Sequence, residues 1–408
     1  MTEEGRNLLI TGAAGFTGRQ AVRYFAAAGR RVTAVVRRPI PQEGENTSPL
    51  FPAGVNVRVC DLGDKEAIRE LVRETAPDEV LHLAGRNSVP ESWQNPLLYM
   101  ETNVMAVLHI LDALRAFPAC RILVAGSRLK FRPEAGEAPP HPYSLSKTLA
   151  ELSALSWGTL FGQDVRVAEP CNLIGPGPST GFCALLAGHI VRCERGEAAG
   201  TFRLSSRHAS RDFLDVRDAV RAYDRILSEG SAGMVYRIES GTARPLGEVA
   251  AALLAETTAL VPMDWGPAAA EITDSPQPQP QQPQPQSEQQ PQREPQLQPQ
   301  PHPQSQPEQQ PQREPQLQSQ PHPQSQPEQQ PQREPQLQPQ PYPQLQPEQQ
   351  PQREPQLQSQ PHPQSQPAQQ PQKRARESDA AQLGWRPETE LRQSLRDSLR
   401  YFRQEADV

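Results

Sequence analysis

Two short segments, far apart in the sequence but in a fixed order, constrain the fold of this 408-residue chain more than any other feature. The first, TGAAGFTG at residues 11–18, follows an apolar stretch and carries three evenly spaced glycines. The second, YSLSK at residues 143–147, opens a stretch with helical character. A glycine-rich turn between a strand and a helix can hold a dinucleotide, and a tyrosine four residues before a lysine can move a proton. Together the two segments predict a dinucleotide-dependent enzyme, although either alone would be weak evidence.

Apolar strands alternate with helical stretches in the N-terminal part of the chain. We expect strands at residues 7–11, 32–36, 55–59, 79–83, 121–125 and 165–168, and helices at 19–28, 65–74, 95–117 and 144–160. Each strand is apolar throughout, which is typical of a parallel sheet covered by helices on both faces. The predicted fold class is therefore α/β, a Rossmann-type parallel sheet with ligands bound beyond the carboxyl ends of its strands.

A proline- and glutamine-rich repeat interrupts the C-terminal part. Most of the 47 prolines lie between residues 276 and 371, where PEQQPQREPQLQSQPHPQSQ recurs with restarts at Pro307, Pro327 and Pro347. Such a segment has too little aliphatic surface to form a core, so we expect a disordered insertion of polyproline II character. An alternative hypothesis is that it binds a weak partner, such as an SH3-like groove or a second copy of itself.

The sequences on either side of the repeat, at residues 247–256 and 383–404, look folded. We therefore expect the repeat to be an insertion within a smaller C-terminal substrate lobe. The predicted boundaries are a Rossmann domain at residues 1–174, a substrate-binding lobe at 175–275, the insertion at 276–372, and the end of the lobe at 373–408.

Composition argues against several classes of function. The formal net charge is −6 and no basic stripe is present, so we expect neither nucleic acid nor an anionic membrane as a partner. The acidic start lacks the apolar core of a signal peptide, and we find no apolar run that we expect to span a bilayer. No CxxC occurs among the cysteines, which favours a reduced, cytoplasmic protein without a metal site: Cys60, Cys120, Cys171, Cys183 and Cys193.

The glycine-rich turn is the predicted pyrophosphate site. Gly12, Gly15 and Gly18 would let the backbone turn tightly and approach the pyrophosphate, which would rest on the start of the following helix with Phe16 and Thr17. An ordinary glycine-rich turn is the alternative.

Residues after the next strands are expected to select the cofactor. Arg37 and Arg38 stand where an NAD-binding site usually carries an acidic residue, and arginine can pair with a 2′-phosphate. We therefore favour NADP(H) over NAD(H), while solvated strand-end arginines remain an alternative. Asp61 and Leu62 are expected near the adenine. Leu83, Ala84 and Gly85 are expected near the nicotinamide.

Three residues are the predicted catalytic group. Tyr143 and Lys147 are spaced to share one helix face, so the ammonium could lower the pKa of the phenol toward a useful range. Lys147 could also hold the nicotinamide ribose, and Ser127 could bind the substrate carbonyl. Taken singly, they could be a half-buried aromatic, a solvated charge and a loop hydroxyl.

These residues resemble those of the extended short-chain dehydrogenases/reductases, the NAD-dependent epimerase/dehydratase family. Further stretches resemble the GDP-4-keto-6-deoxy-D-mannose reductases within it: SWQNP at 92–96, ETNV at 101–104, NLIGPG at 172–177, RDFLDVRD at 211–218 and LGWRP at 383–387. The resemblance implies NAD(P)H-dependent reduction of a C4 ketone to give GDP-D-rhamnose. It also implies substrate contacts from Asn172 and Arg211, and a homodimer paired through helices such as 95–117 and 144–160. An ion pair of Arg211 with Asp212 or Asp215 is the structural alternative.

Two residues depart from the family pattern. Leu129 stands where a 4,6-dehydratase carries a glutamate, and a leucine cannot shuttle a proton. Glu169 stands where an arginine often precedes the proline, and it would repel a diphosphate unless turned away. A 4-epimerase, a 4,6-dehydratase and a catalytically weak nucleotide-sugar-binding protein therefore remain alternatives to the reductase.

Overall fold

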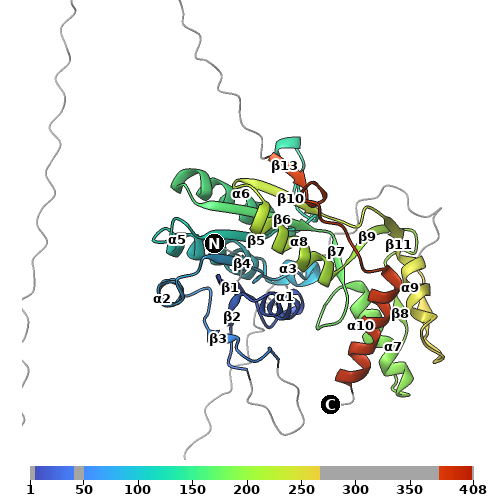
Figure 1. The fold of residues 1–408 in the computed structure, drawn as a ribbon. Helices are drawn as coiled ribbons and strands as arrows, with labels where there is room; N and C mark the ends of the chain where they lie inside the picture. The colour runs from blue at the N-terminus through green and yellow to red at the C-terminus, as the bar shows by residue number, and fades with distance from the viewer. Residues whose placement is uncertain (1–4, 41–49, 267–375, 407–408) are drawn as a thin grey trace, which may run out of the picture. The chain divides into compact units, whose positions relative to one another are not determined.

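The computed structural model describes residues 5–40, 50–266 and 376–406, and the predicted insertion at 276–372 lies outside them. Eight parallel strands form the main sheet in the order β13-β10-β6-β5-β4-β1-β2-β3 (Figure 1). Their bounds are β1 Asn7–Thr11, β2 Arg31–Val36, β3 Asn56–Val59, β4 Glu79–His82, β5 Arg121–Ala125, β6 Asp164–Pro170, β10 Met234–Ile238 and β13 Arg376–Asp379. The strand order reverses between β1 and β4, which is where ligands bind in open sheets of this kind.

Helices cover both faces of this sheet, as predicted. Leu8 and Ile10 of β1 face a core that includes Phe25 and Ile226, from α1 (Phe16–Ala27) and α8 (Val216–Glu229). Leu9 faces the opposite core, which is built with α2 (Lys65–Thr75), α5 (Ala106–Leu114) and α6 (Pro142–Phe161). Because neighbouring residues of a strand point to opposite faces, a strand buried on both sides must be apolar throughout.

The segment between β4 and β5 contains a long interrupted helix. After α3 (Val89–Gln94), α4 (Pro96–Met100) continues through a π-helical turn (Glu101–Met105) into α5. By length and composition alone, Pro96–Leu114 could cross a bilayer, which the sequence analysis did not expect. Core helices of soluble proteins meet the same criterion. Here α5 packs against α2 and α6.

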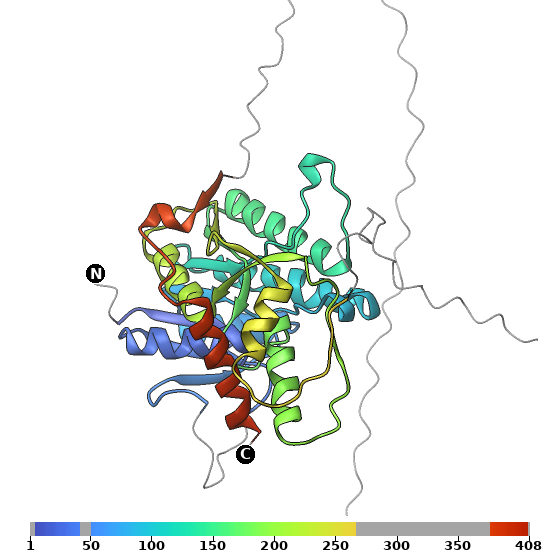
Figure 2. The same ribbon diagram turned by 90° about the vertical axis from the view of Figure 1, so that its right-hand side faces the viewer.

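The smaller lobe has its own core. A three-stranded sheet in the order β11-β9-β7 lies beside a two-stranded pair of β8 (Phe202–Arg203) and β12 (Met263–Asp264). The three strands are β7 Asn172–Ile174, β9 Ser210–Asp215 and β11 Ala243–Pro245. The helices α7 (Phe182–Glu194), α9 (Leu246–Leu254) and α10 (Leu391–Glu405) lie side by side (Figure 2) and share an apolar core.

The chain does not divide at residues 174 and 373 as the predicted boundaries require. β10 pairs in parallel with β6, and β13 pairs in parallel with β10, so both extend the main sheet from within the segments assigned to the lobe. The lobe is therefore inserted between strands of one sheet. β13 reads RESD, and such a charged sequence suits the exposed edge of a sheet but gives no apolar signal.

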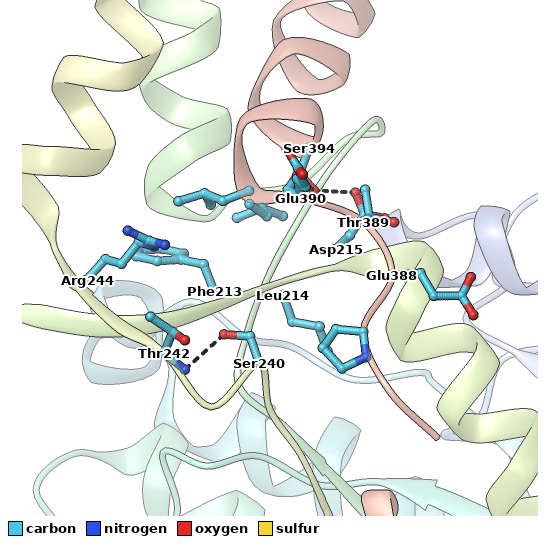
Figure 3. A pocket seen from close by; sticks show the side chains of 13 residues that line it. Phe213, Leu214, Asp215, Ser240, Thr242, Arg244, Glu388, Thr389, Glu390 and Ser394 are labelled. Carbon is cyan, nitrogen blue, oxygen red and sulfur yellow. Dashed lines mark hydrogen bonds between the residues drawn. The ribbon is translucent and has the colours of Figure 1, made fainter. Parts of the chain in front are cut away.

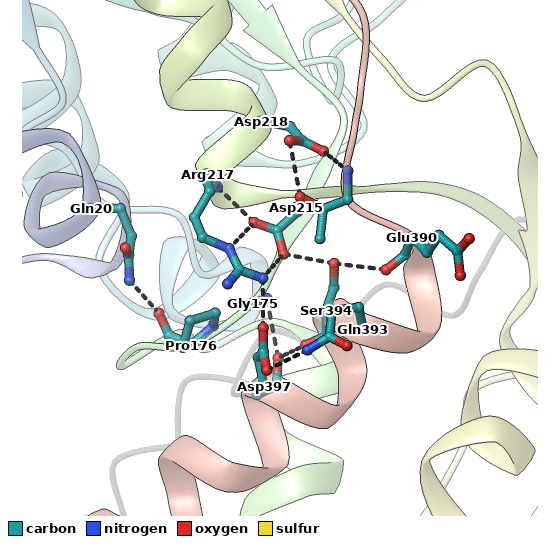
Figure 4. Close-up of polar contacts among 12 residues, drawn as sticks. Gln20, Gly175, Pro176, Asp215, Arg217, Asp218, Glu390, Gln393, Ser394 and Asp397 are labelled. Atoms are coloured by element: carbon teal, nitrogen blue, oxygen red, sulfur yellow. Dashed lines mark hydrogen bonds and ion pairs between the residues drawn. The ribbon is translucent and has the colours of Figure 1, made fainter. Parts of the chain in front are cut away.

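Buried carboxylates fasten the C-terminal segment that follows the short helix Ala380–Leu383. Asp218 accepts hydrogen bonds from the backbone nitrogens of Glu388 at 3.2 Å and Thr389 at 2.9 Å. Asp215 accepts a bond from the Ser394 hydroxyl at 2.6 Å and pairs with Arg217 at 2.8 Å (Figure 4). Two acids of the RDFLDVRD segment therefore hold the returning chain against the lobe.

Candidate active site

The glycine-rich turn lies directly against the end of β4. Gly12 has a φ of +66°, and a Cβ atom added to it would lie 2.7 Å from the Ala84 backbone nitrogen. A Cβ atom on Gly18 would lie 2.1 Å from the Gly12 carbonyl oxygen. Only glycine fits at these positions, and the fit brings the turn against Leu83 and Ala84. The first turn of α1 has no side-chain cap at Gly15, so its amides are free to bind an anion.

The loop that enters the smaller lobe packs on the same turn. The Gln20 side chain donates to the Pro176 carbonyl at 2.8 Å (Figure 4). A Cβ atom on Gly177 would lie 2.9 Å from the Phe16 ring. The start of α1, with Phe16 and Thr17, is therefore bordered by both parts of the protein.

The ends of β2 and β3 carry the other residues predicted to contact the cofactor. Arg37 and Arg38 are exposed immediately after β2, and neither has an ion-pair partner among the described residues. The Asp61 carboxylate accepts a hydrogen bond from the Gly63 nitrogen at 2.9 Å and so stabilises its own turn. The Leu62 carbonyl lies 3.1 Å from His109 Nδ1. All four residues lie at the carboxyl edge of the sheet.

Ser127, Tyr143 and Lys147 come together at the carboxyl end of β5. Ser127 and Tyr143 are 8 % and 5 % exposed, and their hydroxyls are hydrogen-bonded. Lys147 donates from Nζ to the Ala125 carbonyl at 2.9 Å. A Cβ atom on Gly85 would lie 3.7 Å from Lys147 Nζ, which places the predicted nicotinamide end of the cofactor site beside this group.

The protonation of Tyr143 differs from the expectation. Burial raises the pKa of Tyr143, and the hydrogen bond with Ser127 opposes this rise only in part. Burial also lowers the pKa of Lys147, to about 8. The prediction of a lowered Tyr143 pKa is therefore wrong, because desolvation of the phenol is the largest cause and Lys147 is not among the groups that shift it. The raised pKa favours the neutral phenol, which is the form that carries a proton to donate.

The first turn of α6 fixes the tyrosine ring. His141 Nδ1 accepts from the Ser144 nitrogen at 2.9 Å and caps the helix just before Tyr143. The His141 ring stacks on Tyr143 at 5.9 Å, and Tyr99 contacts Tyr143 edge-on at 6.3 Å. Helix capping and ring contacts together leave the phenol few orientations.

Asn103 is a site-supporting residue that sequence reasoning did not assign. It is 2 % exposed and donates to the Arg86 carbonyl at 3.0 Å and to Ser146 Oγ at 2.9 Å. Its side-chain oxygen accepts from the Arg86 nitrogen at 2.7 Å. Asn103 thus ties the loop after Gly85 to the catalytic helix. It lies in the π-helical turn, a feature that often marks functional sites.

The predicted substrate residues lie on two strands of the smaller lobe. Asn172 donates to the Asp212 carbonyl at 2.9 Å and so links β7 to β9. Arg211 is exposed and donates to the Ser210 carbonyl at 2.9 Å. The alternative of an ion pair is wrong, since Asp212 accepts instead from Gly241 N at 3.1 Å and Asp215 pairs with Arg217.

Arg244 lies directly opposite Arg211 in the antiparallel β9–β11 pair and was missed by sequence reasoning. It pairs with Glu248 at 2.7 Å and lines a cavity of about 230 Å³ (Figure 3). Ser240, Thr242 and Glu390 also line this cavity, over an apolar floor that includes Phe213 and Leu214. Like charges opposite one another destabilise a sheet, and the ion pair with Glu248 offsets the charge of Arg244.

No cluster of three or more His, Cys, Asp or Glu side chains that could hold a metal ion is found within residues 5–40, 50–266 and 376–406.

Comparisons with known proteins agree with this geometry. The profile of the NAD dependent epimerase/dehydratase family matches residues 8–238. The GDP-6-deoxy-D-mannose reductase of Pseudomonas aeruginosa is 34% identical over 256 residues, which are 60% of this chain and 78% of that protein. A dTDP-glucose 4,6-dehydratase of Streptomyces antibioticus is 31% identical over 58% of this chain and 72% of its own.

Among solved structures, RMD from Pseudomonas aeruginosa in complex with NADPH has a TM-score of 0.59 at 23% identity, covering 98% of this chain and 99% of its own. The UDP-glucose 4-epimerase of Thermus thermophilus in complex with NAD has a TM-score of 0.54 at 23% identity, covering 63% and 85%. At this identity the structures establish a shared fold.

Proposed function

Because the chain belongs to the NAD-dependent epimerase/dehydratase family, we propose that it is an NAD(P)H-dependent reductase of a nucleotide sugar. Its proposed reaction is the reduction of the C4 ketone of GDP-4-keto-6-deoxy-D-mannose to GDP-D-rhamnose. The observation that carries this proposal is the buried hydroxyl of Tyr143, hydrogen-bonded with that of Ser127. The 34% identical relative named for a GDP-6-deoxy-D-mannose reductase supports the choice of sugar.

The residues at the carboxyl edge of the sheet fit a nicotinamide dinucleotide. The backbone approach at Gly12 and the uncapped start of α1 suit a pyrophosphate, and Lys147 beside Gly85 suits the nicotinamide ribose. Exposed Arg37 and Arg38 favour NADP(H), as does the NADPH bound by the similar Pseudomonas structure. When bound, the cofactor supplies the hydride for the carbonyl carbon.

The protein's own residues would bind and protonate the ketone oxygen. The Ser127 and Tyr143 hydroxyls would both donate to it, which polarises the carbonyl. As negative charge develops on that oxygen, Tyr143 would transfer its phenolic proton. The Lys147 ammonium would stabilise the phenolate that remains and so favour the transfer.

The direction of proton transfer at Tyr143 distinguishes the reductase from the alternative enzymes. An epimerase or a 4,6-dehydratase begins by oxidising the C4 hydroxyl, a step that needs Tyr143 as a base. Burial raises the pKa of Tyr143 and so disfavours the phenolate that this role requires. A dehydratase also needs a proton shuttle for elimination. Leu129, which lies two residues after Ser127 in the serine loop and is 45 % exposed, cannot act as one.

The nucleotide part of the substrate would lie on the smaller lobe. Arg211 and its cross-strand neighbour Arg244 would flank the diphosphate, because planar guanidinium groups match phosphate oxygens. The Asn172 amide already links β7 to β9, so its first role is to fix this strand pair. Any contact of Asn172 with the sugar would use its side-chain oxygen or its second N–H.

We also propose a homodimer built on the helices that flank the catalytic group. Leu97 and Met105 of the long interrupted helix are 75 % and 43 % exposed, and Leu149 and Leu152 of α6 are 38 % and 44 % exposed. Apolar side chains exposed on two packed helices suit a self-complementary interface. Sedimentation of the purified protein would test this directly.

The central experiment is a cofactor-oxidation assay. The protein is mixed with enzymatically prepared GDP-4-keto-6-deoxy-D-mannose, and the absorbance of NADPH and of NADH is followed in parallel. Loss of the NADPH signal with formation of a GDP-6-deoxyhexose supports the proposal. No loss with either cofactor, despite measured cofactor binding, overturns it in favour of another sugar, epimerisation or a binding role.

A further inference from the structure

A buried ionic cluster lies beneath the loop that carries the catalytic serine. The Lys130 ammonium contacts the Glu151 carboxylate at 2.6 Å and also the Glu169 carboxylate. The three side chains are 10 %, 8 % and 0 % exposed, respectively. They come from three elements: the loop after β5, the middle of α6, and the end of β6.

We propose that this cluster is a positioning device that holds Ser127 in register with the catalytic helix. The inference rests on the proposed function only for the identity of the reaction. The position of the serine loop does not depend on that function. Lys130, Glu151 and Glu169 are positioning residues, since they touch neither the reacting hydroxyls nor the predicted cofactor site.

The loop is attached to α6 at two successive points. Lys130 pairs with Glu151, and the Phe131 backbone exchanges hydrogen bonds with the Thr148 hydroxyl at 3.2 and 3.1 Å. Within the loop, the Ser127 carbonyl accepts from the Lys130 nitrogen at 3.3 Å. The Ser127 hydroxyl accepts from the Leu129 nitrogen at 3.1 Å. A shift of Lys130 would therefore move both the backbone carbonyl and the hydroxyl of Ser127.

Helix α6 carries both the catalytic residues Tyr143 and Lys147 and the cluster residue Glu151. Tyr143, Lys147 and Glu151 are successive members of an i, i+4, i+8 row, so they lie along one stripe of α6. Glu169 fixes the other side of the ammonium to β6, next to β5 in the sheet. Lys130 thus ties the serine loop both to the helix that carries Tyr143 and to the sheet.

The charges of the cluster are nearly balanced by its surroundings. Arg128 approaches Glu169 at 3.8 Å and Glu239 at 3.7 Å, while Arg237, opposite Glu169 on the adjacent strand, pairs with Glu377 at 3.6 Å. Burial opposes the charge of Lys130, but hydrogen bonds and attraction from both carboxylates raise its pKa overall. Burial and the nearby Glu169 raise the pKa of Glu151 to about 7. The ammonium therefore stays charged between its two partners.

Stability alone does not account for such a cluster. A buried ion pair contributes little net stability compared with apolar residues of similar volume, but removal of one partner leaves uncompensated charge. What the cluster does provide is a fixed position for the loop. A displacement of about 1 Å at a reacting group can cost about 100-fold in rate, so this position matters for the reaction.

The test compares Lys130→Met with a matched cluster at the opposite end of the sheet. There Glu79 is fully buried and pairs with Arg6 at 3.0 Å and Arg30 at 3.1 Å. Hydrogen–deuterium exchange of the peptide covering residues 126–132 is measured without sugar, together with the Kd of NADPH. Lys130→Met should speed exchange of this peptide at least tenfold. Glu79→Gln should lower the melting temperature but leave the exchange rate of this peptide unchanged.

With the ketosugar, Lys130→Met should lower kcat by about 10- to 100-fold while the Kd of NADPH stays unchanged. Lys130→Arg should restore most of the rate. The double variant Lys130→Met/Glu169→Gln removes the unpaired charge and provides a folded test protein if the single variant does not fold. Unchanged exchange in both Lys130→Met proteins, or equal acceleration in Glu79→Gln, overturns the proposal. If the proposed function is wrong, the wild type will not turn over the ketosugar. The exchange measurement will still decide whether the cluster positions the loop.

Discussion

Gly12 and Ala84 are in backbone contact across the point where the strand order of the sheet reverses. A Cβ atom on Gly12 would lie 2.7 Å from the Ala84 nitrogen and 2.8 Å from its Cα atom. The glycine-rich turn and the end of β4 therefore form one surface, on which the pyrophosphate and the nicotinamide half of a dinucleotide could lie together.

Gly12→Ala should abolish measurable NADPH binding, because the added methyl group must push the turn away from β4. Gly54→Ala is the matched control. Gly54 also has a positive φ, +84°, but nothing lies within 4 Å of its Cβ position. Both variants should lose about 1 kcal/mol of stability from the backbone conformation, whereas only Gly12→Ala should lose NADPH fluorescence enhancement. Equal NADPH affinity in the two variants would contradict the close-approach argument.

Tyr143→Phe should lower kcat by about 10²- to 10⁴-fold, the usual contribution of a positioned acid, with little change in the Kd of NADPH. Tyr24→Phe is the control, since the Tyr24 hydroxyl binds Asp224 at 2.9 Å, away from the catalytic group. Single-turnover reduction of the ketosugar measures the chemical step. If Tyr143→Phe retains the wild-type rate, the proposed proton route is wrong.

Most of the sheet and the catalytic group could be predicted from local sequence. β1, β2, β4 and β5 are short and mostly apolar, whereas β3 reads NVRV at the sheet edge and is largely exposed. The spacing of Tyr143 and Lys147 already places both on one helix face. Topology beyond Ile238 could not be predicted, because β13 pairs with β10 across more than a hundred residues and its RESD sequence carries no strand signal. Pairings of that range depend on the tertiary fold.

Side-chain environments were the other limit of prediction. From sequence, Glu169 is a charge to be turned away from a diphosphate, but the fold buries it against Lys130. The spacing of Tyr143 and Lys147 predicts a lowered phenol pKa, whereas burial reverses the direction. Both outcomes depend on desolvation, which depends on contacts between distant segments.

The pH dependence of reduction should follow Lys147. Burial brings the pKa of Lys147 from 10.5 to about 8, so its charge is present at neutral pH and is lost as the pH rises through about 8. We expect kcat to fall above that pH, and Lys147→Met to be slow and to lack this limb. A pH–rate profile with no limb near pH 8 in the wild type would contradict the assignment.

Asp218→Asn should destabilise the protein by about 3 kcal/mol, because a fully buried acceptor of two backbone amides loses its charge. Asp379→Asn is the control. Asp379 caps the next short helix through Ala381 N at 2.9 Å, and asparagine caps equally well. Urea unfolding measures both. Similar midpoints for the two variants would show that the hydrogen bonds of Asp218 contribute little to the free energy of unfolding.

Arg244→Leu should raise the KM for the nucleotide sugar about tenfold with kcat nearly unchanged, since Arg244 would bind the diphosphate equally in ground and transition states. Arg225→Leu is the matched control, because Arg225 also pairs with a glutamate four residues later on an exposed surface. Binding of GDP by calorimetry provides a second measure. Its affinity should fall with added salt in the wild type and respond less to salt in Arg244→Leu. If both leucine variants bind GDP as the wild type does, the diphosphate does not lie between Arg211 and Arg244.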